Sequence, residues 1–186
     1  MKLIYKGKFN GNPDSLPHGE HKEGAVKFKE IDDPKKLGLI MNVLSIFLLI
    51  FLEGLCAIRS GIVFNVFGAL LALLSMFPHE FLHAICFKKE VYLYTNWKQG
   101  MLFVIGCEDM SKTRFIFLSL LPNLVFGIIP LCIYFINPQY SILGTLGVFA
   151  TTMGIGDYYN VFNALTQMPK GARTYLYKFN SYWYIP

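Results

Sequence analysis

Two histidines and a glutamate stand close together in the sequence, in the order His79-Glu80-Phe81-Leu82-His83. On an α-helix, residues four apart share one face, so both imidazoles can reach a single metal ion. Glu80 follows His79 directly and can take a proton from a water molecule beside that ion. A zinc ion held in this way would acidify the water and polarise a peptide carbonyl. The pattern therefore predicts Zn²⁺ ligands at His79 and His83 and a catalytic base at Glu80.

A chance match to so short a pattern is the alternative interpretation, and the surroundings argue against it. The three residues lie in a long apolar segment, where each ionisable side chain needs a partner, a metal or a water-filled cavity. Pro78 precedes them, and a proline removes a backbone N–H and can open a helix locally. The setting therefore favours a metal site.

The composition indicates a membrane protein. Of 186 residues, 54% are hydrophobic and 16% are charged, whereas soluble domains carry about 25% charged residues. A membrane-spanning helix needs about 20 mostly apolar residues. Four segments meet this requirement and are predicted as spans: 37–58, 62–87, 115–136 and 141–168.

The polar segments complete the expected organisation. Residues 1–36 form a polar N-terminal region, and residues 169–186 form an aromatic and basic tail. Between the second and third spans, two β-prone runs within residues 91–105 flank a loop that ends in glycine, which predicts a short hairpin. The predicted fold class is therefore an all-α integral membrane protein, with a metalloprotease-like domain over 37–168 and one cytoplasmic β-hairpin.

Lysine and arginine set the expected orientation, because they accumulate in cytoplasmic loops. They are frequent in the N-terminal region, in the loop between the second and third spans and in the tail, whereas the two tight turns hold only Arg59. This alternation predicts a multi-pass protein of the cell membrane with both termini in the cytoplasm.

Depth in the membrane selects Asp157 as the third zinc ligand, since a catalytic zinc normally has three protein ligands. His79 lies about eight residues from the cytoplasmic end of its predicted span, or roughly 12 Å. Asp157 lies about eleven residues, or roughly 16 Å, from the cytoplasmic end of its own span, in which it is the only acidic residue. Two further side chains are candidates for a supporting role. Asn123 could donate to a developing oxyanion, and Asn160 could orient the Asp157 carboxylate, with plain interhelical hydrogen bonds as the alternative for both.

Other candidate ligands are less well placed. Cys86 shares a face with His79, but seven residues of helical rise separate them by about 10 Å. Glu53 is expected near the outer end of the first span, remote in depth. The remaining candidates are predicted to lie at solvated surfaces: Glu108, Asp109, His18 and His21.

Three stretches resemble a bacterial family of zincin-like membrane peptidases that is catalogued as a domain of unknown function. They are Pro78 to Ile85, Leu121-Pro122-Asn123 and Gly156-Asp157, and the resemblance covers most of residues 35–170. More distantly, the chain is similar to the site-2 proteases, which cut within the membrane using HExxH on one helix and an aspartate on a later one.

The resemblance implies the same roles as the spacing does. His79, His83 and Asp157 would bind zinc, and Glu80 would act as base. The chain departs from the site-2 pattern after the aspartate, because glycine precedes Asp157 and Tyr158 follows it. This difference leaves the substrate class open.

The sequence thus predicts a zinc-dependent intramembrane endopeptidase that cleaves a membrane-associated peptide or protein near the cytoplasmic face. The alternative is a non-proteolytic metal-binding membrane protein, namely a sensor, a transporter component or a pseudoprotease. The expected partners are the lipid bilayer and the substrate. No nucleic acid is expected despite the net charge of +5, because no basic stripe interleaved with aromatic residues is present.

Overall fold

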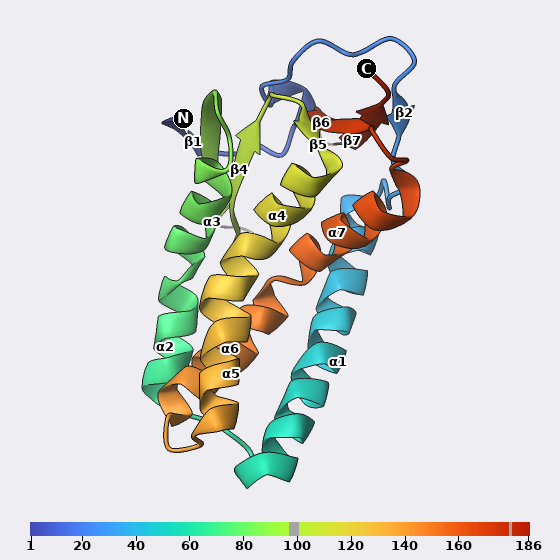
Figure 1. Cartoon of the computed structure of the whole chain (residues 1–186). Coiled ribbons are helices and arrows are strands. Elements are labelled where there is room, and N and C mark those ends of the chain that lie inside the picture. The colour runs from blue at the N-terminus through green and yellow to red at the C-terminus, as the bar shows by residue number, and fades with distance from the viewer. Residues whose placement is uncertain (97–100, 179) are drawn as a thin grey trace. The chain divides into compact units, whose positions relative to one another are not determined.

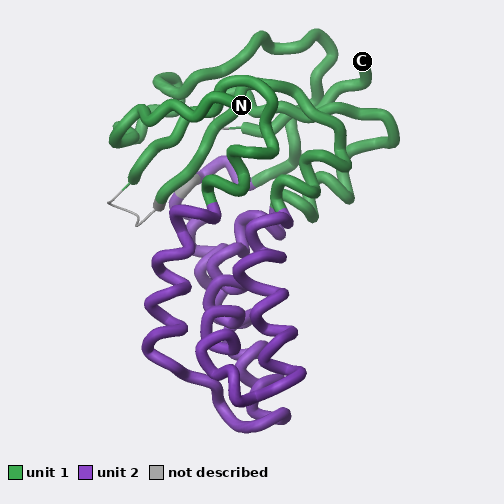
Figure 2. Tube along the Cα trace, turned by 60° about the vertical axis from the view of Figure 1, so that its left-hand side comes forward, with its two compact units in different colours: residues 1–30, 80–119, 160–186 green, residues 31–79, 120–159 purple. Residues whose placement is uncertain are grey.

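The computed structural model describes residues 1–96, 101–178 and 180–186. The chain forms two compact units, each assembled from separate stretches of sequence (Figure 2). Unit 1 comprises residues 1–30, 80–119 and 160–186, and unit 2 comprises residues 31–79 and 120–159. Each unit is described separately.

Unit 2 is helical (Figure 1). Its first helix, α1 (Pro34–Ser60), begins where the Asp33 carboxylate accepts a hydrogen bond from the N–H of Lys35 at 2.8 Å, which caps the free amides of the first turn. The helix ends at Gly61, whose φ of 99° is accessible to glycine. The other helices that contribute to this unit are α2 (Val66–Leu74), the start of α3 (Met76–Ile85), the end of α4 (Lys112–Pro122), the π-helical segment η2 (Asn123–Ile128), α5 (Ile129–Ile136), α6 (Ser141–Met153) and the start of α7 (Ile155–Gln167).

Helix α6 is the centre of unit 2, because it packs against α1, α2, α5 and η2. Small residues allow these approaches, as is usual for helices that pack without a hydrophobic driving force. A Cβ at Gly147 would stand 2.6 Å from the backbone nitrogen of Leu131, so only glycine permits the observed contact with α5. Unit 2 contains a buried hydrophobic cluster formed by Leu52, Cys56, Val63, Leu131, Tyr134 and Val148.

Unit 1 contains two β-sheets. In the first sheet, the strand order is β1 (Lys2–Lys8), β3 (Glu90–Asn96) and β4 (Met101–Gly106). β3 and β4 pair antiparallel, with Leu93 opposite Val104, while β1 pairs parallel with β3. The open edge of this sheet on the far side of β3 from β1 therefore belongs to β4.

The second sheet joins both ends of the chain. Its order is β2 (Val26–Lys27), β7 (Asn180–Tyr184), β6 (Arg173–Tyr177) and β5 (Met110–Ser111), with every pair antiparallel. The segment between β1 and β2 includes a single 3₁₀ turn, η1 (Pro13–Ser15). Phe28 is buried with Ala164, Met168 and Ala172, so the N-terminal region and the C-terminal tail share one core.

The prediction of an all-α fold is wrong. The structure is 55% helical and has 18% of its residues in two sheets. The two strands expected within residues 91–105 are present, but they belong to a three-stranded sheet completed by β1, and residues 97–100 between them lie outside the described part of the chain. Local alternation of apolar residues finds β3 and β4, but it carries no signal for the pairing of β3 with residues 2–8.

The prediction of four spans is also corrected. Within the described residues, three helical stretches are long and apolar enough to cross a membrane, namely 35–60, 66–85 and 112–136. The fourth expected span, 141–168, is two shorter helices, α6 and α7, which meet at Gly154. Of these, α6 is the apolar one. A Cβ at Gly154 would overlap the side-chain amide of Asn123, so the chain changes helix where another segment occupies the space beside it.

Candidate metal centre

Helix α3 carries the two histidines and the glutamate, and its start follows from the sequence around it. α2 ends at Leu74 and α3 begins at Met76. Pro78 lies in the first turn of α3 and has no N–H to offer the carbonyl four residues earlier, at Leu74. The N–H of His79 resumes the helical pattern by donating to the Ser75 carbonyl at 2.8 Å. The break between the two helices therefore lies directly before the histidine pair.

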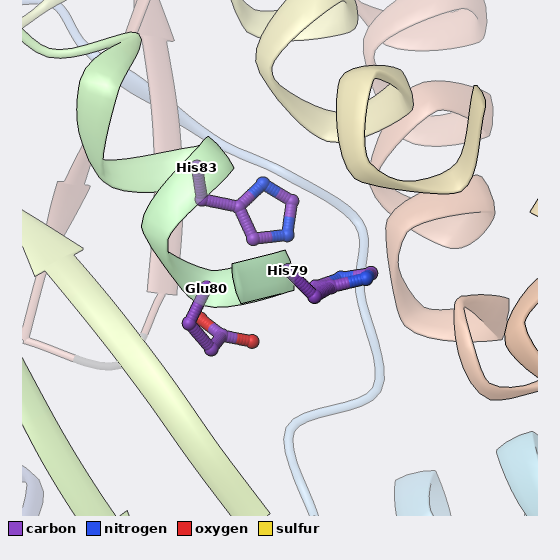
Figure 3. A group of neighbouring side chains, drawn as sticks. All are labelled: His79, Glu80 and His83. Atoms are coloured by element: carbon purple, nitrogen blue, oxygen red, sulfur yellow. The ribbon is translucent and has the colours of Figure 1, made fainter. Parts of the chain in front are cut away.

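On α3, His79 and His83 extend to the same side of the helix, with Glu80 leaving it beside them (Figure 3). The potential ligand atoms of His79, Glu80 and His83 all lie within 4.8 Å of one another. The helix places His79 and His83, at positions i and i+4, on one face. The three residues form a group that can hold a metal ion.

His83 is oriented by a backbone carbonyl. It is 6% exposed, and its Nδ1 lies 2.9 Å from the carbonyl oxygen of Leu118 in α4. Because a carbonyl oxygen can only accept, Nδ1 carries the proton, and in the neutral imidazole Nε2 then keeps its lone pair. A histidine held in this way presents Nε2 to a metal, as histidine ligands of zinc commonly do.

His79 and Asp157 lie together within unit 2. The Nε2 atom of His79 is 3.2 Å from Oδ2 of Asp157, and both side chains are largely buried. Two ligand atoms about 2.0–2.1 Å from a tetrahedral zinc lie roughly 3.3 Å from one another. The observed separation of these two atoms therefore fits a shared zinc ion.

Asn123 holds the Asp157 carboxylate. It is 1% exposed and lies at the first position of η2, and its Nδ2 donates to Oδ2 of Asp157 at 2.7 Å. π-Helical segments are rare and occur frequently at functional sites. The orienting contact that the sequence suggested for Asn160 is thus made by Asn123, while Asn160 lies one turn beyond Asp157 in α7.

Glu80 contacts strand β4 of the first sheet in unit 1. Its Oε2 accepts a hydrogen bond from the backbone N–H of Val104 at 3.1 Å. The sequence gives no signal for this contact, because the donor is a main-chain amide that any residue at position 104 except proline would supply.

The rival ligands have structural partners. Glu53 accepts from the N–H of Val63 at 3.1 Å, in the turn that follows α1. Cys86 donates through Sγ to the Leu82 carbonyl at 3.4 Å. His18 and His21 lie against tyrosines of the second sheet, in contacts that include His18 with Tyr177 and His21 with Tyr175, Tyr177 and Tyr182.

The prediction that Glu108 is solvated is wrong, because it is only 9% exposed. Its carboxylate accepts from the N–H of Lys88 at 3.0 Å and of Lys89 at 2.7 Å, directly after α3, and it pairs with the guanidinium of Arg114. Arg114 also donates through Nε to the carbonyl of Cys86 at 2.9 Å. Together, Glu108 and Arg114 fasten the end of the histidine-bearing helix to the start of α4.

Asp109 is also partnered. It accepts from Nε of Arg173 at 2.6 Å and from the hydroxyl of Tyr184 at 2.6 Å, and it thereby ties the chain before α4 to strands β6 and β7. Its role is structural.

Helices suited to a membrane and a His–Glu–His group on one of them define a membrane-compatible protein with a zinc-type metal centre. The chain belongs to the family described as "putative zincin peptidase", whose model matches residues 70–173, more than half of the sequence. Membership confirms the expected family and implies zinc as the cofactor. The distant similarity to the site-2 proteases is not shown by the comparisons. No curated protein and no solved structure gives a significant match.

Proposed function

We propose that the protein is a zinc-dependent endopeptidase that cleaves a membrane-associated peptide or protein close to the cytoplasmic face of the membrane. The observation that carries this proposal is the distance of 3.2 Å between Nε2 of His79 and Oδ2 of Asp157. His79 lies on the same helix as Glu80 and His83, and their ligand atoms are close together. His79, His83 and Asp157 would hold the metal. A bound zinc ion supplies acidification of a water molecule and polarisation of the peptide carbonyl.

The remaining steps belong to side chains of this chain. Glu80 takes the proton of the attacking water and later delivers it to the amine that leaves when the peptide bond breaks. The bond from His83 to Leu118 and the bond from Asn123 to Asp157 keep two ligand groups oriented before substrate arrives. A site prepared in this way needs little rearrangement during the reaction.

The apolar surface supports action at a membrane. Large side chains on α1 are strongly exposed, including Phe47 at 66% and Ile50 at 63%, which suits contact with lipid. His79 lies six residues before the end of α3 at Ile85, or about 9 Å of helical rise. This distance favours a reaction near one face of the bilayer.

The sheets support a common side of the membrane for the polar segments. β1 pairs with β3, and β2 pairs with β7. These pairings support placing the N-terminal region, the middle of the chain and the tail on the same side of the membrane. The abundance of lysine and arginine in these segments supports the cytoplasm as that side.

The open edge of β4 is a place where an extended substrate could pair. A peptide must be extended to be cut, and an exposed strand edge offers backbone donors and acceptors to it. Glu80 already contacts this strand through Val104. Pairing along β4 would therefore bring the peptide to the catalytic base.

The first test measures zinc content and peptide hydrolysis in the same preparations of purified protein. Wild-type protein in detergent is expected to carry one zinc per chain and to hydrolyse dye-quenched casein, an unfolded probe. His79→Ala and Asp157→Ala should lose the metal, since each removes a ligand, whereas Glu80→Gln should keep it and lose turnover by roughly 100-fold or more. Metal would be measured by mass spectrometry and turnover by fluorescence.

The outcomes separate the alternatives. Zinc lost with His79→Ala but retained in Asp157→Ala removes Asp157 from the ligand set. Zinc bound by a wild type that leaves casein intact favours a non-proteolytic metal-binding protein. A wild type that binds no zinc when supplied with it contradicts the proposal altogether.

A further inference from the structure

One backbone amide at the open edge of strand β4 already makes a hydrogen bond to a side chain. The Val104 N–H donates to Oε2 of Glu80 at 3.1 Å. In an antiparallel pair, alternate residues turn their N–H groups toward the partner strand and away from it. Since the Val104 N–H leaves the β3–β4 ladder, it belongs to the set that faces the open edge, together with that of Leu102.

Glu80 stands on the first turns of a helix, and its side chain has three rotatable bonds. A carboxylate of this kind can occupy several rotamers unless a partner selects one. Hydrogen bonds to charged groups contribute about 1.5–3 kcal/mol, enough to select one arrangement. The donor here is a main-chain group fixed by pairing with β3, so its position does not depend on a second flexible side chain.

We infer that the backbone amide of Val104 is a positioning group for catalysis, which holds the Glu80 carboxylate in place for proton transfer. This inference rests on the proposed peptidase function and adds a residue to it. Because this amide is committed to Glu80, a peptide that pairs along β4 is held by neighbouring edge groups and not by position 104. Loss of the Val104 N–H should therefore lower kcat and leave KM nearly unchanged.

Proline substitutions distinguish the two roles of the β4 edge, which are positioning of Glu80 and pairing with a substrate peptide. Val104→Pro removes the N–H without removing a bond of the ladder, and proline is tolerated at strand edges. Leu102→Pro is the matched control, because it removes the next outward N–H, which lies away from Glu80.

With casein as the probe, Val104→Pro should reduce kcat by about 100-fold, the size of effect that a displacement of roughly 1 Å can produce. Its KM should change less than about threefold, and its zinc content should equal that of the wild type. Leu102→Pro should keep kcat and raise KM. Equal losses of kcat in the two proline variants would overturn the inference, as would a Val104→Pro variant that loses only KM.

A second measurement needs no substrate. In ¹⁵N-valine-labelled, metal-free protein in micelles, the Val104 amide should exchange with solvent about tenfold faster or more in Glu80→Ala than in the wild type. Exchange that is identical in both proteins would contradict the contact even if a proline variant fails to fold. A wild type that shows the protected amide but cleaves no casein overturns the peptidase function, and the contact would then be purely structural.

Discussion

The Glu108 carboxylate illustrates how much depends on single residues outside the metal centre. Burial raises the pKa of this group, but the N–H groups of Lys88 and Lys89 and the Arg114 guanidinium lower it more, so that its pKa lies below the ordinary value of 4.5. The ionised form is therefore the one that the folded protein stabilises. These contacts hold the end of α3, whose other turns carry the histidines.

A folded-state pKa below the unfolded value contributes stability that is present above the unfolded pKa and is lost as the pH falls. We expect Glu108→Gln to be destabilised by roughly 3 kcal/mol at pH 7, because Arg114 keeps its charge without its partner. The difference from the wild type should shrink as the pH falls below 4.5. Thermal unfolding in detergent between pH 7 and pH 3.5 measures both effects.

The exposed residue Glu23 provides the control for that experiment. Glu23→Gln should change the unfolding temperature little at any pH. If Glu108→Gln behaves in the same way, the carboxylate does not stabilise the end of α3.

At the same scale, prediction from sequence succeeds where chemistry is local. The helical spacing of His79, Glu80 and His83 brings their ligand atoms together. Asp157, chosen by its depth, lies beside His79, and its binding of zinc stays a prediction. Glu108 and Val104 were missed because their partners are backbone amides or distant side chains. No periodic pattern in the sequence records such contacts.

Among the elements, the join between α6 and α7 depends on Gly154. We expect Gly154→Ala to destabilise the protein by about 1–3 kcal/mol, because the added methyl group overlaps Asn123 and forces one of the two segments to move. The displacement should also disturb the bond from Asn123 to Asp157 and weaken zinc binding. Unfolding temperature and zinc affinity, the latter by competition with a chromogenic chelator, test the two effects.

Gly156 gives a matched comparison two residues away, since a Cβ there meets nothing within 4 Å. Gly156→Ala should be neutral or stabilising by up to about 1 kcal/mol, as alanine favours a helix. If the two alanine variants have equal stability and equal zinc affinity, the close approach of Gly154 to Asn123 has no energetic importance.

Hydropathy predicts the extent of the long apolar stretches well. The first span, expected over 37–58, is α1 at 34–60, and the third, expected over 115–136, corresponds to the stretch 112–136. The fourth was predicted as one helix because its apolar residues continue past Gly154. Asn123 of η2 lies against the chain at this break, and a composition average cannot detect such a contact.

For the whole molecule, shared sheets predict which segments lie on the same side of the membrane. In a background without cysteines, Lys6→Cys and Lys170→Cys are exposed positions in unit 1, and Ile62→Cys and Gln139→Cys are exposed positions in turns between helices of unit 2. An impermeant maleimide applied to inverted membrane vesicles should label the first two and not the last two. Intact cells should give the reverse pattern.

Two results would be informative contradictions. Labelling of Lys6→Cys and Lys170→Cys from opposite sides would show that the sheets do not form as described. Labelling of both only from outside the cell would keep the sheets but reverse the proposed orientation.

The parallel pairing of β1 with β3 has a consequence for synthesis of the chain. Lys2 and Glu90 are 88 residues apart, yet their side chains meet across these strands. At about 5–20 residues per second, the ribosome needs roughly 4–18 s to make the partner of a strand that it has already released. During that time β1 is an unpaired strand beside a nascent chain rich in apolar helices. Lys2, Lys6 and Lys8 make it a poor template for unintended pairing, because charged lysines oppose association at strand edges.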